Sequence, residues 1–220
     1  MCGKFTTKLS WTELVDFIDR PVEAGDDDRI LTLRVMDVLP VIVWDGGDRR
    51  ILPMRWGFPH PDDWRRPQPI HARAETIDTT RAFARPFRDG QRGILLAQTF
   101  NEAPDIKGPT IQHTITPDGP VGIAVIWRRF DIAGREPLLA CCMVTVAANP
   151  LIAALPTDRM PAVLAPEDWA VWLGEEDASP DRVKACLKTQ DGVRWTMTKE
   201  ERAQKAAPRK PTVSDPVGLF

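Results

Sequence analysis

Short runs of apolar and β-branched residues, separated by Gly, Pro and Asp, dominate this chain. They cover residues 29–35, 40–44, 50–56, 92–100, 110–115, 121–127 and 138–148. Runs of this length and composition are typical of strands. The stretches "WDGGDRR" and "TPDGPVG" resemble the tight turns of β-hairpins. The pattern therefore predicts a mainly antiparallel β core.

Helical periodicity is confined to a few segments. A helix over residues 10–21 is expected to follow an N-terminal strand, because Ser10 and Glu13 form a capping box and Pro21 ends the apolar stripe. Further helices are expected over residues 79–87, 165–173 and 179–187. Strands in the middle with helices around them indicate the α+β class.

The length of 220 residues fits one domain. No repeat and no linker divides the chain. Residues 199–220 carry charge and proline without periodicity, so we expect an extended tail. The basic side chains of this tail are expected to be solvated rather than bound to DNA. They are Arg202, Lys205, Arg209 and Lys210.

Charge and cysteine content narrow the function classes. The net charge of −2 excludes a globally basic protein, so any nucleic acid must bind at a local basic patch. The spacing of the four cysteines fits neither a zinc site nor a disulfide framework. Cys141 and Cys142 lie in a strand-like run and are expected to serve packing. No signal peptide or membrane-length apolar run occurs, so we expect a cytoplasmic protein with reduced thiols and no membrane partner.

Cys2 gives the chain a specific chemical possibility. If Met1 is removed, residue 2 carries an α-amine and a thiol on adjacent carbons. The amine can form a Schiff base with an aldehyde, and the thiol can close on the imine carbon to give a five-membered thiazolidine. The same cysteine could instead be the thiol nucleophile of an N-terminal-nucleophile hydrolase, with the amine as base.

Four stretches occur in an order that resembles a known family. They are "MCGKF", "PMRWGFPHPDDW", "PIHARAETIDTTRAF" and "LPTDRMPAVL". Together they resemble the SOS-response-associated peptidase (SRAP) family, from residue 2 to about residue 175. The resemblance implies an SRAP domain over residues 2–198 with a barrel-like β core, acting as a monomer. It also implies capture of abasic sites in single-stranded DNA through a Cys2 thiazolidine, without a metal or organic cofactor.

The same resemblance assigns catalytic roles. Glu102 in "QTFNEAP" takes the place of a glutamate that acts as general acid and base. His71 stands where the family has an asparagine that holds the N-terminal residue and the sugar. Thr157 stands where the family has a histidine implicated in proton transfer, a task that a hydroxyl cannot perform near pH 7. His71 could supply the lost imidazole, or both changes could be drift. Ala103 replaces an aromatic residue on which a base would stack.

The expected DNA contacts combine arginine and tryptophan, which suit phosphates and unpaired bases respectively. They are Arg73, Arg159, Trp56 and Trp64, with Met160 shaping the pocket. Trp56 could equally belong to the core. Glu75 is expected to buttress an arginine, and His60 and His113 are interpreted as surface residues without a role.

Two other functions compete with this hypothesis. The first is an N-terminal-cysteine peptidase or amidohydrolase. Its glutamine-using version is disfavoured, because the usual M-C-G-I start and a later N-G-D element are both missing. The second is a diverged SRAP protein that binds single-stranded DNA without reacting, which the changes at His71 and Thr157 would allow.

Overall fold

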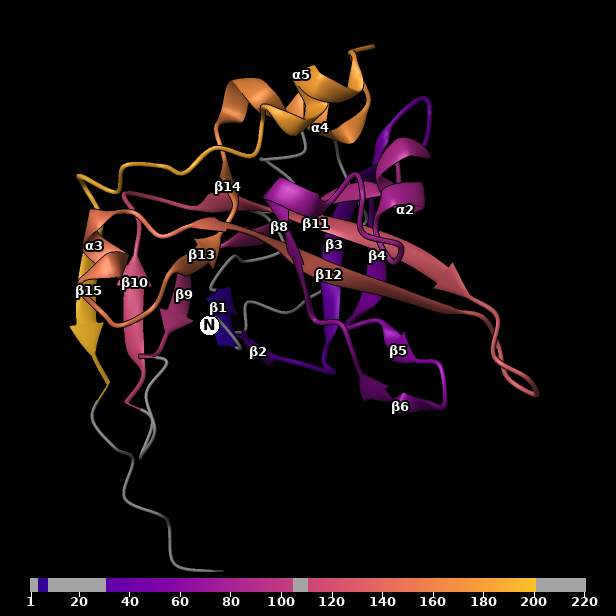
Figure 1. Ribbon diagram of the computed structural model, residues 1–220, viewed down its shortest axis with the longest axis horizontal. Coiled ribbons are helices and arrows are strands. Elements are labelled where there is room, and N and C mark those ends of the chain that lie inside the picture. Colours follow the sequence, from indigo (N-terminus) through magenta and orange to yellow (C-terminus); the bar gives the residue numbers. More distant parts are fainter. Residues whose placement is uncertain (1–3, 8–30, 105–110, 201–220) are drawn as a thin grey trace, which may run out of the picture.

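The computed structural model describes residues 4–7, 31–104 and 111–200 (Figure 1). The helix expected over residues 10–21 lies outside the described residues. Within them, strands predominate and the helices are short, so the α+β class is confirmed.

Five strands form a closed barrel, which confirms the barrel-like β core. The order of pairing is β12 (Leu138–Ala147), β4 (Arg49–Trp56), β3 (Val38–Trp44), β8 (Arg92–Ala97) and β11 (Val121–Phe130), and β11 pairs again with β12. Every pairing in this ring is antiparallel except that between β12 and β4.

Both edges of β12 carry additional short strands. On one edge, β13 (Arg159–Pro161) pairs with β12 and β14 (Val163–Leu164) pairs with β11, so this segment lies between the two long strands. On the other edge, β7 (His71–Arg73) runs parallel to β12, just beyond the point where β4 pairs with it. Because β12 has neighbours along both edges, it can gather segments that are distant in sequence.

A second sheet stands beside the barrel, at the left of Figure 1. Its order is β15 (Thr196–Lys199), β10 (His113–Thr116), β9 (Thr99–Glu102), β1 (Lys4–Thr7) and β2 (Leu31–Arg34), with antiparallel pairing throughout. Only Gln98 separates β8 from β9, so one continuous segment joins the barrel to this sheet. The chain's first described strand, β1, therefore lies between β2, the next strand in sequence, and β9, which comes from much later in the chain.

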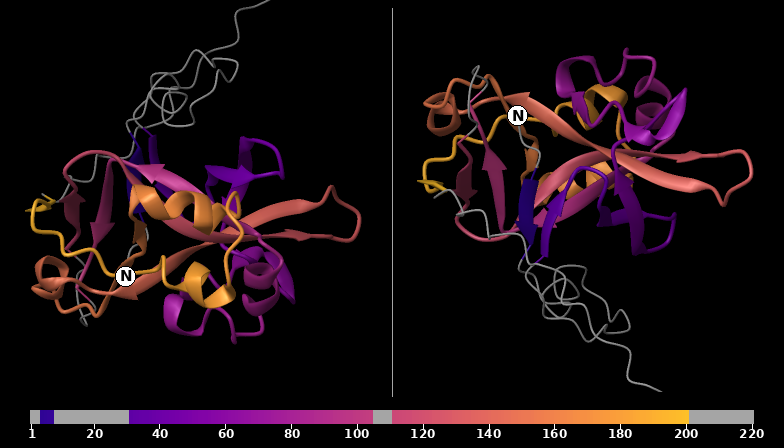
Figure 2. Two further views of the ribbon diagram at one scale, coloured as in Figure 1. Left: turned by 90° about the horizontal axis from the view of Figure 1, so that it is seen from above. Right: turned by 90° about the horizontal axis from the view of Figure 1, so that it is seen from below.

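The helices lie at the periphery of the molecule, as Figure 2 shows. The three expected within the described residues are confirmed, although each is shorter than its sequence segment. Their bounds are α2 Ala84–Arg88, η2 Pro166–Asp168 continuing into α4 Trp169–Leu173, and α5 Pro180–Lys184. Two further elements were not expected: η1 Ala74–Thr76 and α3 Pro150–Ala153. The hairpin of β5 (Pro59–His60) and β6 (Asp63–Pro67) projects from the other side of the barrel.

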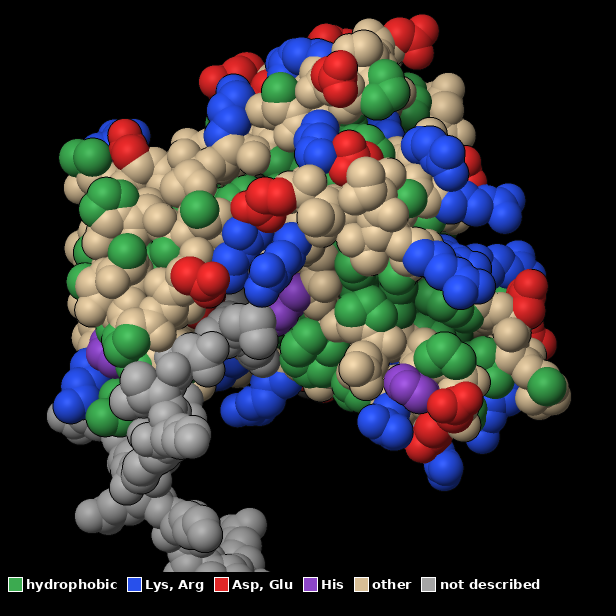
Figure 3. All heavy atoms as spheres, viewed as in Figure 1, with side chains coloured by type: hydrophobic (Ala, Val, Ile, Leu, Met, Phe, Trp, Pro, Cys, Tyr) green, Lys and Arg blue, Asp and Glu red, His purple; other side chains and the backbone are tan. Residues whose placement is uncertain are grey.

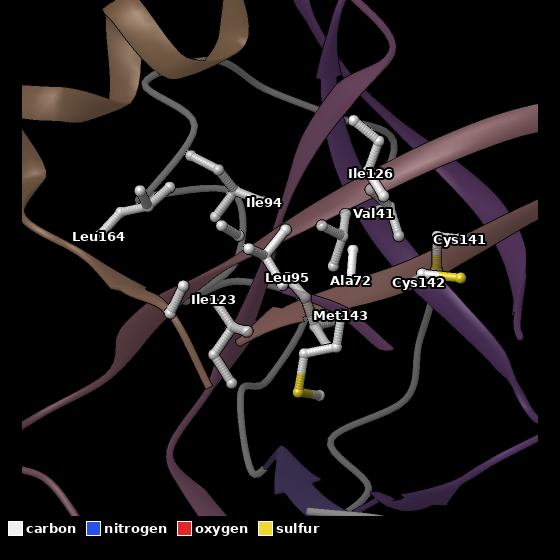
Figure 4. Close-up of a cluster of buried hydrophobic side chains, with 14 of the residues drawn as sticks. Val41, Ala72, Ile94, Leu95, Ile123, Ile126, Cys141, Cys142, Met143 and Leu164 are labelled. Carbon is white, nitrogen blue, oxygen red and sulfur yellow. The ribbon is translucent and has the colours of Figure 1, made fainter. Parts of the chain in front are cut away.

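Buried, mostly aliphatic side chains from β3, β8, β11 and β12 fill the barrel and form the core (Figure 4). Cys141 and Cys142 point to opposite sides of β12, and both are fully buried. Burial raises the pKa of Cys141 to about 12 and also raises the pKa of Cys142. The expected packing role of both cysteines is confirmed.

One of the two predicted hairpin turns is right and the other is wrong. Residues 44–50 join β3 to β4, with Trp44 opposite Arg49 and with Asp45 accepting the N–H groups of Gly47 and Asp48. Residues 116–122 do not join a hairpin, because β10 pairs with β9 and β15 whereas β11 pairs with β8, β12 and β14. Turn residues indicate that the chain reverses direction, but they do not determine which strands pair. Here the strands before and after the turn belong to different sheets.

Among the described residues, no helix combines the length and the apolar character needed to cross a membrane.

Candidate functional site

Glu102 is the last residue of β9 and is fully buried. It lies two residues beyond Phe100, which pairs with Phe5 of β1. Because side chains alternate along a strand, Glu102 shares the face of Phe100 and Phe5. A buried carboxylate on the strand beside β1 is an unusual use of a core position, since burying a charge is costly without compensation.

A chain of aromatic contacts connects β1 with β7. The ring of Phe5 lies 5.2 Å from the ring of Trp56, and Trp56 lies 6.2 Å from the imidazole of His71. The indole N–H of Trp56 donates to the carbonyl of Ile70 at 3.2 Å, which fixes the segment that leads into β7. His71 is partly buried and stands opposite Met143 of β12. The structure therefore places the expected His71 close to the start of the described chain.

Arg159 and Glu75 are joined on the neighbouring wall formed by β7, β12 and β13. The guanidinium donates to both carboxylate oxygens of Glu75, at 2.6 and 2.9 Å, and to the carbonyl of Thr145 at 2.6 Å. The hydrogen bond from Arg159 lowers the pKa of Glu75. Glu75 thus buttresses an arginine, as the sequence predicted. Arg73 stands opposite Thr145 in the register and is exposed.

On the face of the molecule shown in Figure 3, the basic side chains do not form one continuous stripe. Figure 3 shows separate groups of Lys and Arg, one of which lies beside a histidine near the middle of the view. A protein with a net charge of −2 can offer a phosphate backbone only such local groups.

Thr157 lies in the loop between α3 and β13 and is half-buried. Its hydroxyl reaches the carbonyl of Arg159 at 3.5 Å, the long limit of a hydrogen bond. It follows α3, whose start is capped by the side chain of Asn149. The loop thereby brings Thr157 to the same wall as Arg159.

Two expected DNA contacts are corrected by burial. Trp56 has no exposed surface and packs within the core, so it offers no face to a base; the alternative core role is the right one. Met160 is also fully buried, and its sulfur accepts the N–H of Asn149. Met160 stands opposite Val146 of β12 and has no exposed surface to offer to DNA.

Trp64 is not brought to this site. It lies on β6, where the guanidinium of Arg135 covers its ring at 4.4 Å. A pocket of about 720 Å³ beside it is lined by the β5–β6 hairpin, His60 and residues 130–133, and contains neither Glu102 nor His71. A stacking role for Trp64 would need a DNA path that extends well beyond Glu102.

Cys2 lies outside the described residues. The three cysteines within them, Cys141, Cys142 and Cys186, are all buried, and burial raises the pKa of each thiol. A buried thiol with a raised pKa is a poor nucleophile. In the described ranges, no cluster of three or more His, Cys, Asp or Glu side chains is arranged to hold a metal ion.

His113, expected from the sequence to be a surface residue without a role, is partly buried beside Glu102. His113 stands directly opposite Glu102 in the pairing of β10 with β9, and its Nδ1 atom is buried. Residues directly opposite on antiparallel strands share a face. The alternation in "TIQHTI" could have indicated the face of His113, but not which strand would lie beside it.

The comparison with protein families settles the affiliation of the chain. The model of the SOS response associated peptidase (SRAP) family matches residues 1–203. The chain belongs to the SRAP family. Among curated relatives, it is 27% identical over 201 residues to the abasic site processing protein YoaM of Bacillus subtilis, covering 87% of each chain. It is 26% identical over 202 residues to the abasic site processing protein YoqW of the same organism, covering 87% of this chain and 88% of YoqW.

Solved structures share the SRAP protein's fold. A crystal structure of a protein from Bacteroides thetaiotaomicron superposes with a TM-score of 0.80 at 19% identity, over 96% of this chain and 97% of that one. A protein from Bordetella bronchiseptica gives a TM-score of 0.75 at 18% identity, over 91% of this chain and all of the other. The barrel with its adjoining sheet is therefore an architecture that strongly diverged sequences adopt.

Proposed function

We propose that this SRAP protein processes abasic sites in single-stranded DNA by capturing their aldehyde covalently through Cys2. The observation that carries the proposal is the buried Glu102 on β9, directly beside the strand that begins two residues after Cys2. Two Cα–Cα steps span at most about 7.6 Å, so the covalent chain keeps Cys2 near the start of β1. The names of the relatives YoaM and YoqW support abasic sites as the substrate.

The capture proceeds in two bond-forming steps. Once Met1 is removed, the neutral α-amine of Cys2 attacks the aldehyde carbon, and loss of one water gives an imine. The thiol sulfur then bonds to the imine carbon, and its proton ends on the nitrogen, which closes the thiazolidine. In this account Glu102 donates a proton to the departing water and accepts one during ring closure. Ring closure also removes the imine that would otherwise promote strand cleavage by β-elimination.

The surrounding residues have supporting tasks in this account. Arg73 is exposed on the wall next to His71 and is suited to a phosphate. Arg159 is committed to Glu75 and to the Thr145 carbonyl, so its part is to hold that wall in place. His71 orients the sugar or moves a proton, because an imidazole can do either near neutral pH.

The test is incubation of the purified protein with a single-stranded oligonucleotide that carries one abasic site, followed by a denaturing gel. The wild type is expected to give a denaturation-resistant band, and Cys2→Ser to give none that survives. Cys186→Ser is the matched control and should retain the band. Binding without a band would indicate a non-reactive DNA-binding module. Release of peptide or amide products through Cys2 would indicate the hydrolase alternative.

A further inference from the structure

A carboxylate near the end of the described chain reaches back to its beginning. Glu200 directly follows β15, and its Oε1 accepts hydrogen bonds from Lys4 Nζ at 2.9 Å, Asn101 Nδ2 at 2.7 Å and Thr114 Oγ1 at 3.0 Å. The backbone N–H of Glu200 donates to the carbonyl of Gln112 at 2.8 Å, which fixes the position of the carboxylate. One side chain thereby ties β1, β9 and β10 to the segment after β15.

This network lies on the opposite face of the sheet from Glu102. Phe5 pairs with Phe100, and Asn101 pairs with Thr114, so alternation puts Lys4, Asn101 and Thr114 on one face. Phe5, Phe100 and Glu102 occupy the other face. From this opposite face, Glu200 binds Lys4 of β1, two residues after Cys2 in sequence, and Asn101 of β9, directly before Glu102.

Lys4 and Glu200 form an ion pair that is partly shielded from solvent. The Lys4 and Glu200 side chains are 25% and 32% exposed. The hydrogen bond from Lys4 is the largest of the causes that lower the pKa of Glu200, ahead of the contributions of Thr114 and Asn101. Hydrogen bonds to an ionised group are shorter and stronger than those between neutral groups, so the carboxylate defines where Lys4 lies.

We infer that Glu200 is a positioning residue that fixes the N-terminal aminothiol against Glu102. This inference rests on the proposed function. Cys2 precedes Lys4 by two residues, so the position of Lys4 limits where the amine and thiol of Cys2 can reach. A misplacement of about 1 Å can slow a reaction by about 100-fold. Glu200, the last described residue, anchors Lys4 through its hydrogen bond.

The experiment measures the single-turnover rate of adduct formation with an abasic oligonucleotide over a range of DNA concentrations. Glu200→Gln, which keeps the shape of the side chain, and Glu200→Ala are compared with the wild type. The matched control is Glu175→Gln, since Glu175 accepts two hydrogen bonds from Arg49 but has no link to β1. We expect the rate at saturating DNA to fall about 10-fold or more in both Glu200 variants. The half-saturating DNA concentration and the control's rate should stay unchanged.

A double-variant comparison separates positioning from general stability. If Lys4 and Glu200 act as one unit, Lys4→Gln should lower the maximal rate by itself but not further in the Glu200→Gln background. A maximal rate equal to wild type in Glu200→Gln, or an equal loss in Glu175→Gln, would overturn the inference. Should Glu200→Ala fail to fold, Glu200→Gln carries the test. Failure of the wild type itself to form an adduct would instead refute the proposed function.

Discussion

At the scale of single residues, the proposed capture depends on Glu102, a carboxylate that the fold buries completely. Glu102 has no exposed surface, whereas the side chain of Glu75, the ion-pair partner of Arg159, is 54% exposed. A buried position is where a carboxylate can hold and release protons with the least competition from water.

Glu102→Gln should separate chemistry from binding. The amide keeps the shape and one acceptor but cannot transfer a proton, so the rate of adduct formation should fall by about 10²–10⁴-fold. Affinity for intact single-stranded DNA should change little, as a binding titration would show. Glu167 of η2 is exposed, so Glu167→Gln is the control and should behave like the wild type. Parallel losses in rate and in affinity would make Glu102 a structural or binding residue.

The presence of His71 and Thr157 at positions where the family has asparagine and histidine leads to a prediction about the release of DNA from the adduct. With Thr157 in place of the family's imidazole, we expect His71 to handle the proton. The wild type should then release DNA with a pH dependence typical of an imidazole, whose reference pKa is about 6.5. His71→Asn should slow release, and adding Thr157→His should restore it. The measurement is competition with excess unlabelled abasic oligonucleotide across neutral and mildly acidic pH.

His113 provides a second candidate proton carrier, which the same release assay can distinguish from His71. Because His113 stands opposite Glu102, His113→Gln belongs in the same series. Unchanged release in this variant is expected if His71 is the proton carrier. Slow release in His113→Gln together with normal release in His71→Asn would transfer the role to His113. Equal release rates in all variants would show that none of these positions handles the proton.

The residue types of the site could be predicted from sequence, but their exposure could not. The motifs identified Glu102, His71 and Arg73 as candidates, and Glu75 was expected to buttress an arginine without indicating which one. That arginine is Arg159, which was itself expected to contact DNA but donates to Glu75 and to the Thr145 carbonyl. Trp56 was the misleading case, because an aromatic residue in a conspicuous motif suits a stacking surface and a core equally well. Which of the two applies depends on the strands packed around it.

At the scale of elements, helices α2, α4 and α5 and the strands of four or more residues in the apolar runs could be predicted, while the strands of two or three residues could not. The three residues of β7 and the two of β14 are too few to show any periodicity, yet β7 carries His71 and Arg73. The parallel pairing of β7 and β4 with β12 was equally hidden, since no local signal specifies a partner that lies more than 70 residues away.

Close packing of β11 gives a stability prediction at this scale. A Cβ added at Gly122 would lie 2.6 and 2.8 Å from atoms of the Trp169 ring and 2.9 Å from Ile94. Overpacking of this kind costs about 1–3 kcal/mol, so Gly122→Ala should lower the midpoint of denaturant unfolding. Gly47→Ala, where the nearest atom is 3.9 Å away, is the control and should be close to neutral. Equal stability of the two variants would contradict the packing described for α4 on β11.

At the scale of the whole molecule, barrel closure is what assembles the site. The pairing of β11 with β12 closes the ring, β7 and β13 flank β12, and β9 continues from β8 into the sheet that holds β1. Strands from the start, middle and end of the described chain are thereby held in two joined sheets, and Trp56 links Phe5 of β1 to His71 of β7. The overall charge contributes little, because a net charge of −2 does not attract DNA by itself.

The central claim is that the α-amine and thiol of Cys2 together capture an abasic site. Intact mass spectrometry of the protein and of its adduct with an abasic oligonucleotide tests this most directly. The account predicts a mature chain that lacks Met1, and an adduct whose mass is the sum of that chain and the oligonucleotide minus one water. An adduct formed in full yield by a chain that retains Met1 would contradict the account.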